Sequence, residues 1–329
     1  METEVGRRLQ SVELGPPQEY KSIVVLPMLC PEKGKCNYLT LGEALNEQSI
    51  SVTEVSDAVV VPFLLVMNRG RLPVLLVDGE ELAGAKQNRV LNTSILVKEG
   101  SKAKVPVSCT EHGRWSYASA AFEQSGNLMA HKMRARKARS VSESLLREAS
   151  YESNQDQVWD DIQELQAKAN AQSPTSAMKD VFGSREEELS NCDKAFQCVP
   201  GQVGLLVLIN GRPVGLDWLS LESAYKRLHT KLVRSYALEA LLEAGPSKVK
   251  TATWAIKAQA FLREIVASKE TRFPSVGYGT DRRFTGKALG GTALVHADEV
   301  IHAAFFRLLE EPSIEGMASL HKRRRRFCE

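Results

Sequence analysis

The first 125 residues alternate short apolar stretches with turn residues, a pattern that indicates β-strands. Six such stretches are bounded by Gly, Pro, Asn, Asp or Ser, at 23–29, 50–55, 58–68, 73–77, 94–97 and 104–108. One helix is expected to interrupt them from Leu41 to Glu47, with Thr40 placed to cap its first turn. The N-terminal third is therefore predicted to be mostly antiparallel β structure.

After residue 125 the apolar positions change to a period of 3.6, which indicates helices. One buried helical stripe is predicted to end before Pro174: Val158, Ile162, Leu165 and Ala169. Ser184 followed by Glu187 matches a capping box, so a further helix is predicted from there to about Gln197.

The C-terminal part returns to strands. Apolar runs at 203–209 and 213–218 flank Asn210 and Gly211, a dipeptide that favours a type I′ hairpin because this turn needs positive φ twice. A long helix is expected from Leu221 until Gly245 and Pro246 end it, followed by a helical partner at 249–267. Residues 292–296 and 300–306 are expected to form a closing hairpin.

These elements predict an α+β fold, with a mostly antiparallel sheet core in the N-terminal third, a helical middle and C-terminal β-hairpins that rejoin the sheet. We expect a single domain at 11–308 and a basic, disordered tail at 309–329. The softest candidates for linkers inside the domain are residues 124–128 and 171–175.

Composition adds constraints on location and partners. The chain has 329 residues, 43% hydrophobic and 25% charged, as in ordinary globular proteins. It has neither an 18-residue apolar run nor an apolar leader, so we expect a cytoplasmic protein with no membrane partner. Its six cysteines are too few for a disulfide scaffold and are expected to be thiols.

Charge is unevenly distributed although the net charge is only +3. A basic cluster precedes an acidic region at 152–164: Lys132, Arg134, Arg136, Lys137 and Arg139. We interpret the cluster as a solvated helix face, because most such runs are solvated. Binding of nucleic acid is left open, and the sequence does not predict an oligomeric state.

The richest candidate chemistry lies at 78–89, DGEELAGAKQNR, after the predicted strand 74–77. Asp78 and Gly79 are expected to begin a turn that presents a polar set: Glu80, Glu81, Lys86, Gln87, Asn88 and Arg89. Adjacent carboxylates with Lys and Arg can bind a polar ligand, or one carboxylate can act as a base if burial raises its pKa. A salt-bridged hairpin in which Asn and Gln hold backbone groups explains the same residues.

A second polar segment, CTEHGRW, follows the strand predicted at 105–108. Glu111 is the better acid or base there, with Arg114 to orient it or to grip an anion. Cys109 can become a nucleophile beside positive charge, but a buried strand residue is the favoured interpretation. Trp115 can stack on a ligand ring or pack on the sheet. We expect the two polar segments to form the rim of one site.

Two further clusters have structural explanations as well as functional ones. Arg227, Lys231 and Arg234 share a helix face that can meet phosphate, although such a stripe usually meets water. In GYGTDRR, at 277–283, the glycines permit a close ligand approach or a tight turn before a strand. Metal binding is not predicted, because the cysteine spacings do not match zinc sites and the pairing of His296 with His302 is only one option.

Five segments together resemble one family: GEELAGAKQNR, PVSCTEHGRW, LVRSYALEAL, GYGTDRRF and LVHADEVIHAAF. Their order is similar to that of the ARG and rhodanese-phosphatase-superfamily-associated protein domain, where ARG stands for ADP-ribosylglycohydrolase, over residues 11–308. The family usually has Gln where this chain has His112. The resemblance implies work near ADP-ribose, nucleotide or phosphate chemistry and picks out Glu80, Glu81, Lys86, Gln87, Asn88, Arg89, Glu111, Arg114 and Arg234.

Two functional hypotheses follow. The first is an enzyme acting on a nucleotide or ADP-ribosyl-type substrate, with Glu81 or Glu111 as the acid or base and Arg89, Arg114 and Arg234 holding anionic groups. The remaining substrate contacts would come from Glu80, Lys86, Gln87, Asn88 and Trp115. The second is a noncatalytic module that binds such a ligand or a protein partner. No cofactor is predicted by either.

Overall fold

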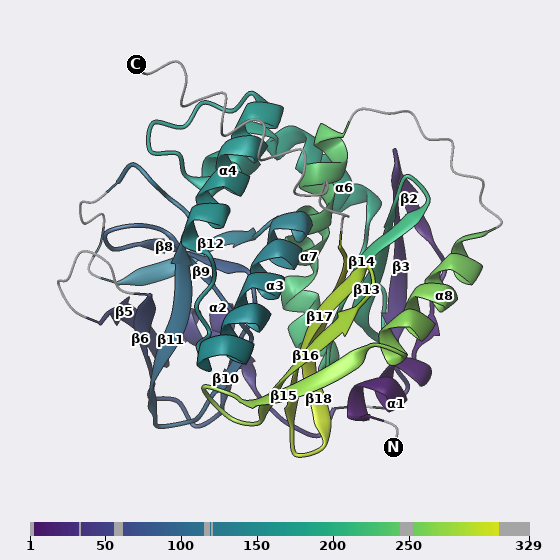
Figure 1. Ribbon diagram of the computed structural model, residues 1–329, viewed down its shortest axis with the longest axis horizontal. Coiled ribbons are helices and arrows are strands. Elements are labelled where there is room, and N and C mark those ends of the chain that lie inside the picture. The colour runs from purple at the N-terminus through teal and green to yellow at the C-terminus, as the bar shows by residue number, and fades with distance from the viewer. Residues whose placement is uncertain are drawn as a thin grey trace.

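The computed structural model describes residues 3–32, 34–55, 62–114, 119, 121–243 and 253–308. The helices are α1 (Glu4–Gln10), α2 (Leu41–Asn46), α3 (His131–Glu148), α4 (Gln155–Ala169), α5 (Met178–Ser184), α6 (Glu186–Ala195), α7 (Glu222–Leu242) and α8 (Trp254–Val266). The strands are β1 (Glu13–Leu14), β2 (Gln18–Tyr20), β3 (Ile23–Leu29), β4 (Leu39–Thr40), β5 (Ile50–Glu54), β6 (Phe63–Asn68), β7 (Val74–Leu76), β8 (Glu80–Gly84), β9 (Arg89–Leu91), β10 (Ile95–Val97), β11 (Lys102–Cys109), β12 (Phe122–Leu128), β13 (Gln202–Ile209), β14 (Arg212–Leu219), β15 (Lys269–Pro274), β16 (Thr280–Gly286), β17 (Leu289–His296) and β18 (Glu299–Arg307). The fold is α+β with mostly antiparallel strands, as predicted (Figure 1).

The largest sheet among the described residues has nine strands in the order β1-β3-β13-β14-β18-β17-β16-β15, with β2 also paired to β3. Its β13–β14 hairpin turns at Asn210 and Gly211, whose φ angles of 51° and 70° are those of the predicted type I′ turn. Strand β18 pairs with both β14 and β17. The closing hairpin therefore joins the sheet that contains the first long strand, β3, and this prediction is confirmed.

The two faces of this sheet contact different helices. Alternate strand residues such as Leu206 and Leu205 belong to separate hydrophobic cores, as expected for a strand buried on both faces. Helices α1 and α8 cover one face, whereas α7 belongs to the core on the other. The helix predicted at 249–267 is thus present as α8, but it packs with α1 instead of α7. Residues 244–252, which include the predicted stop of α7, lie outside the described residues, as does the tail 309–329.

Two smaller sheets form the left part of Figure 1 and enclose a third core. The described residues place six strands in the order β12-β8-β9-β11-β6-β5 and three in the order β10-β7-β4, of which β4 and β7 run parallel. Helix α2 begins at the predicted cap: the Thr40 hydroxyl accepts from the backbone N–H of Glu43, and the Glu43 carboxylate accepts from that of Thr40. This capping box satisfies two N–H groups that the helix itself leaves unpaired.

The middle of the chain is helical, and α4 buries the predicted stripe of Val158, Ile162, Leu165 and Ala169. The capping-box prediction at Ser184 and Glu187 is wrong. Ser184 is the last residue of α5 and its hydroxyl donates to the carbonyl of Val181, while α6 begins after Arg185 without a side-chain cap. Across the described ranges, no helix is both long and apolar enough to cross a membrane.

Helix α3 lies between the two groups of sheets (Figure 1). The prediction that its basic residues form a solvated face is wrong for Arg134 and Lys137, which are both fully buried. Arg134 binds Asp217 of β14, and Lys137 binds Asp78 between β7 and β8. A buried cation needs a partner, because desolvating an unpaired charge is costly. The two ion pairs therefore tie α3 to both groups of sheets.

Candidate active site

The two polar segments found in the sequence lie side by side. The segment predicted as a turn after Asp78 is mostly β-structure, because β8 and β9 pair with Glu81 opposite Val90. Strand β9 pairs in turn with β11, where Arg89 lies opposite Cys109, and the N–H of Thr110 donates to the carbonyl of Asn88. The sheet thus brings residues 80–89 against 109–114.

Glu81 is the most unusual carboxyl group in this region. Its side chain projects from β8 into the protein and the residue is only 1% exposed. The Thr110 hydroxyl donates to Oε1 at 2.8 Å, and Oε2 has no hydrogen-bond partner among the described residues. Burial raises the pKa of Glu81 to about 7, although Thr110, Ser125, Asn127 and the Lys179 ammonium all favour the charged form.

A β-bulge lies opposite Glu81. On β12, Gln124 pairs with Leu82 and Leu128 pairs with Glu80, so the three residues Ser125–Asn127 stand opposite one residue of β8. Gly126 has a φ of +86°, a conformation that other residues rarely adopt, and it allows the strand to bend there. Residues 124–128 are therefore not the linker that the sequence predicted but a bulged strand that shapes the wall beside Glu81.

The outer side of this bulge borders an open hollow of ≈ 750 Å³. Ser125 and Asn127 line it together with Lys179 of α5 and Arg234 of α7. Glu81 is not in the lining, but Ser125 and Asn127 of the lining both favour the charged form of its carboxyl group. The hollow is therefore lined by two basic residues, Lys179 and Arg234, and by two acidic ones, Asp180 and Glu186, and an acid with a raised pKa lies near one wall.

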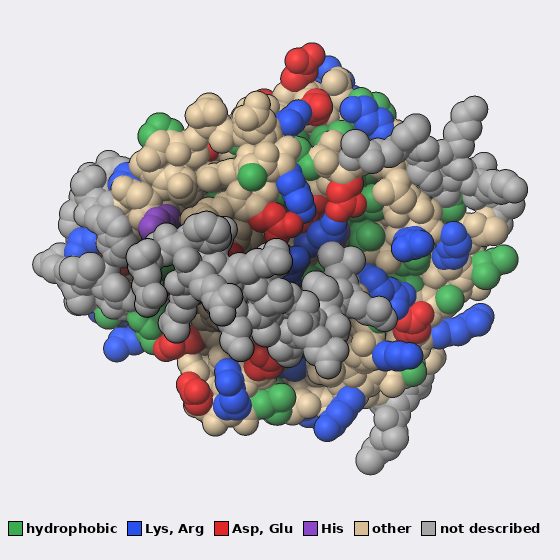
Figure 2. Space-filling model, turned by 45° about the horizontal axis from the view of Figure 1, so that its top comes forward, with side chains coloured by type: hydrophobic (Ala, Val, Ile, Leu, Met, Phe, Trp, Pro, Cys, Tyr) green, Lys and Arg blue, Asp and Glu red, His purple; other side chains and the backbone are tan. Residues whose placement is uncertain are grey.

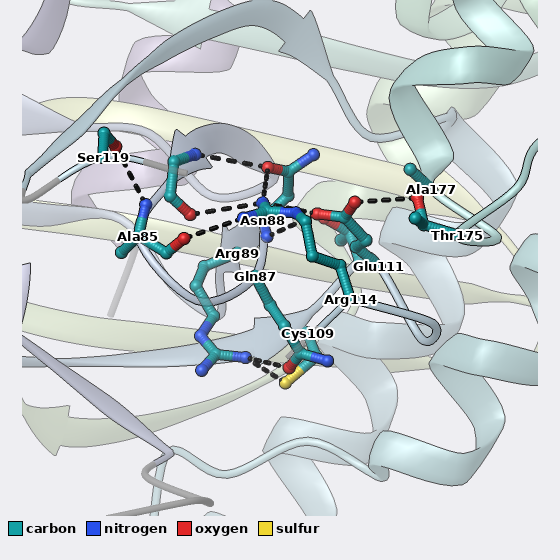
Figure 3. A network of polar contacts seen from close by, with 12 residues as sticks. Ala85, Gln87, Asn88, Arg89, Cys109, Glu111, Arg114, Ser119, Thr175 and Ala177 are labelled. Atoms are coloured by element: carbon teal, nitrogen blue, oxygen red, sulfur yellow. Dashed lines mark hydrogen bonds and ion pairs between the residues drawn. The ribbon is translucent and has the colours of Figure 1, made fainter. Parts of the chain in front are cut away.

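Glu111 holds three loops together (Figure 3). Its Oε2 accepts from the Arg114 guanidinium at 2.7 Å and from the N–H of Asn88 at 3.2 Å, while Oε1 accepts from the Thr175 hydroxyl at 2.8 Å. Burial opposes ionisation of Glu111, but the hydrogen bonds from Arg114, Thr175 and Asn88 outweigh it and lower its pKa. Both carboxylate oxygens are thus used inside the protein, and residues 171–175, predicted as a linker, are fastened by this contact.

Arg114 and Asn88 complete the same network. Arg114 donates to the carbonyl of Ala85 at 2.7 Å and to Oδ1 of Asn88 at 3.2 Å, and that same Oδ1 accepts from the N–H of Gly84. This arrangement matches the second interpretation of residues 78–89, in which an amide side chain and ion pairs hold a hairpin in place. Lys86 is half-buried at the same turn.

Arg89 also makes internal contacts. Its Nη1 donates to Oε1 of Gln87 at 2.9 Å and contacts the Cys109 thiol, and its Nη2 lies 3.6 Å from Glu54. Burial raises the pKa of Cys109, although Arg89 favours the thiolate. Cys109 is therefore a half-buried thiol at the end of β11, in line with the favoured interpretation, and its environment does not activate it as a nucleophile.

The basic face of α7 meets carboxylates, which neither interpretation of the sequence anticipated. Lys231 lies 2.9 Å from Glu80, and Arg227 lies 3.3 Å from Glu43. Arg234 binds both Asp193 and Glu186, with the nearest N–O distances at 2.6 Å and 2.8 Å. Glu80 also accepts from the N–H of Val77. Because successive side chains of a strand point to opposite faces, Glu80 and Glu81 lie on opposite sides of β8. Trp115 lies outside the described residues.

The sequence did not identify Thr110, Ser125, Asn127 or Lys179. The only local signal was Gly126 between two polar residues, which is a common composition for both a bulge and a linker. In the part of the chain that the structure describes, no group of three or more His, Cys, Asp or Glu side chains could hold a metal ion. His302 is buried against Ser94 whereas His296 stacks on Tyr278, so the two do not face each other.

A family model matches most of the chain. The ARG and Rhodanese-Phosphatase-superfamily-associated Protein domain, ARPP-1, matches residues 11–306. The chain belongs to the ARPP-1 family. The match spans all three sheets and both polar segments, so the Glu81 and Glu111 networks are inside the family domain. No curated protein and no solved structure matched the chain.

Proposed function

We propose that this ARPP-1 chain is a cytoplasmic enzyme that acts on an ADP-ribosyl-type or nucleotide substrate, with Glu81 as its acid or base. The observation that supports the proposal is the buried carboxyl of Glu81, whose pKa is raised to about 7 and whose Oε2 has no partner among the described residues. General acid–base catalysis is most efficient when the pKa of the group lies near the working pH. A carboxyl group is costly to bury, which favours a functional reason for it.

The surroundings of Glu81 suggest where a substrate would bind and how a proton would pass between it and the carboxyl group. A diphosphate or phosphate group in the adjacent hollow would be attracted to Lys179 at its rim, whereas Arg234 is already paired with Asp193 and Glu186. Ser125 lines that hollow and its hydroxyl also favours the charged form of Glu81, so we assign it to relay a proton between the two. A protonated Glu81 would supply a proton to a leaving group, and the carboxylate would take one from the attacking water or acceptor.

Glu111, Arg89 and Arg114 have different roles in this proposal. Their charges are engaged with protein groups, so we assign them to holding the residues around Glu81 and not to the substrate. Glu111 fixes Thr175, and the N–H of nearby Met178, the first residue of α5, donates to the carbonyl of Thr110. Glu111 thereby helps to position the hydroxyl that binds Glu81 and the helix that presents Lys179.

The family name supports this choice of substrate class, because it records association with ARG, which we take to be ADP-ribosylglycohydrolase, and with a rhodanese-phosphatase superfamily. Such an association also suits a noncatalytic protein that binds ADP-ribose. The two alternatives differ in one property: a binding module needs the cations of the hollow but has no use for a titrating carboxyl behind it.

The test is turnover of a panel containing NAD, ADP-ribose conjugated to arginine, serine and glutamate side chains, and nucleotide monophosphates, with products separated by liquid chromatography. We expect release of ADP-ribose or phosphate from at least one member. Glu81→Gln should lower that rate by at least about 100-fold, while Glu123→Gln, the same change at an exposed position of the neighbouring β12, should leave it unchanged. Equal rates in the wild type and Glu81→Gln would remove Glu81 from the mechanism, and binding without turnover of any member would favour the noncatalytic alternative.

A further inference from the structure

A second hollow region runs along α3 and shares no lining residue with the hollow beside Glu81. It consists of two adjoining parts of ≈ 650 Å³ and ≈ 510 Å³, which have Ala135, Arg139, Glu143 and Leu308 in common. We name it the α3 groove. Each part is of the size that small-molecule ligands occupy in proteins.

The larger part of the α3 groove is rich in cations. Its described lining includes five basic residues, Lys132, Arg136, Arg139, Arg147 and Arg307, against three acidic ones, Glu143, Glu148 and Glu152. Basic and acidic side chains are otherwise intermixed over the face drawn in Figure 2. Burial lowers the pKa of Lys132, and Lys168 and Arg136 also lower it, whereas the carboxylates of Glu239 and Glu164 oppose the shift.

Arg147 differs from the other cations of the groove. Lys132 is paired with Glu243, Arg136 with Asp161, Arg139 with Glu143 and Arg307 with Glu264. The side chain of Arg147, by contrast, has neither an ion pair nor a hydrogen bond with any described residue. Its guanidinium is therefore available to an anion from solution, and a guanidinium suits the two-oxygen geometry of a phosphate.

The smaller part of the α3 groove is mostly apolar. It is lined by Ala138 and Leu146 of α3 and by the turn between β16 and β17, from Phe284 to Gly291. Leu146 is 67% exposed, unusual for so large an apolar side chain in the described structure. An apolar surface that continues directly from a cationic hollow fits a ligand with a flat, weakly polar ring at one end and an anion at the other.

We propose that the α3 groove binds a nucleoside diphosphate, with the phosphates at Arg147, Arg139 and Arg136 and the base against Ala138 and Leu146. This site is independent of the proposed catalysis at Glu81, since no residue is shared. Ligand binding would give a function to the basic residues of α3 that are not buried. The two buried members of the cluster, Arg134 and Lys137, form ion pairs inside the protein instead.

The experiment is isothermal titration calorimetry of the full chain with ADP, with adenosine and inorganic phosphate as separate probes of the two ends. We expect ADP to bind at least about ten-fold more tightly than either fragment. Arg147→Gln should weaken ADP binding by about ten-fold, and Leu146→Asp should weaken it as well. The matched control is Arg263→Gln, on the exposed face of α8, which should bind ADP as the wild type does.

Three results would overturn the proposal: no binding of ADP at millimolar concentration, equal affinities in Arg147→Gln and the wild type, or a single-stranded oligonucleotide that displaces ADP with higher affinity. The last would identify the groove as a nucleic-acid surface. Repeating the titration with Glu81→Gln separates this site from the catalytic proposal. The Glu81→Gln variant is expected to bind ADP with unchanged affinity. Loss of ADP binding in this variant would place ADP beside Glu81 and contradict the α3 site.

Discussion

Arg134 and Asp217 form a two-pronged ion pair that is completely excluded from solvent. The Arg134 guanidinium donates to the two carboxylate oxygens of Asp217 at 2.6 Å and 3.1 Å, and the Tyr236 hydroxyl donates to the same carboxylate at 2.8 Å. Burial opposes the charge on Asp217, but the attraction of Arg134 and the hydrogen bonds outweigh it and hold the pKa of Asp217 well below its usual range. The pair joins α3 to β14 through the centre of the molecule.

Removal of either partner should destabilise the fold strongly. Asp217→Asn or Arg134→Met leaves a buried charge without its counterion, which typically costs about 3–5 kcal/mol. The double variant should lose less than the sum of the two, because no unpaired charge remains. Urea unfolding of the two single variants and the double variant measures this coupling, and additive losses would show that the two charges do not depend on each other.

The same pair predicts a pH dependence. Because the folded-state pKa of Asp217 is depressed, its contribution to the free energy of unfolding is present above the ordinary carboxyl pKa of 3.8 and is lost as the pH falls below it. Wild-type stability should therefore decline in acid more steeply than that of Asp217→Asn. Chemical unfolding between about pH 3 and pH 6 tests this, and parallel curves would contradict it.

Glu81 should produce the opposite dependence at higher pH. Its folded-state pKa of about 7 lies above its ordinary 4.5, so the folded protein retains a proton that the unfolded chain releases in this window. The free energy of unfolding should then fall as the pH rises from about 4.5 to 7. Glu81→Gln should be more stable than the wild type above pH 7, by up to about 3 kcal/mol.

The measurement for Glu81 is urea unfolding at about pH 4.5, 6 and 8. The difference between Glu81→Gln and the wild type should vanish at the lowest pH. Glu123→Gln, at an exposed position of β12, serves as the control and should follow the wild-type curve throughout. A wild-type curve that is flat across this window would mean that the Glu81 carboxyl is not perturbed.

Glu111→Gln should lower stability and not only activity. The carboxylate accepts hydrogen bonds from Arg114, Thr175 and Asn88, and an amide cannot accept at both of its ends. We expect a loss of about 1–3 kcal/mol in urea unfolding near neutral pH, compared with no loss for Glu187→Gln on the exposed side of α6. A fully stable Glu111→Gln protein that lost turnover would return Glu111 to the list of catalytic residues.

Local patterns were sufficient for several elements of this fold. The Asn210–Gly211 turn and the buried stripe of α4 each depend on residues close in sequence, so the sequence predicts them correctly. The burial of Arg134 was missed because charge was taken as a sign of exposure. Its position nevertheless continues an apolar stripe through Ala138, Val141 and Leu145 at helical spacing, and the carboxylate that permits burial is 83 residues away.

The candidate site was harder to predict because it also depends on residues that are distant in sequence. The sequence singled out Glu81 within a polar segment, but apart from Thr110 the residues that act on its carboxyl group come from β12 and α5, which pairing and packing bring together. The segment 124–128 has the small and polar composition of a linker because a bulge also needs Gly and short polar residues. Composition alone does not separate these two structures.

Gly277 gives a final prediction about the GYGTDRR segment. A Cβ at this position would lie 2.1 Å from the carbonyl oxygen of Leu96, which already accepts from the N–H of Tyr278 where β10 meets the segment before β16. Gly277→Ala should therefore separate the two segments and lower the thermal midpoint by several degrees, roughly 1–3 kcal/mol of stability. The same change at Gly183 of α5, where a Cβ meets no atom within 4 Å, should stabilise the helix by about 0.5–1 kcal/mol. Differential scanning fluorimetry of both variants decides the matter, because a glycine at 277 that served only a ligand would be replaced by alanine without loss of stability.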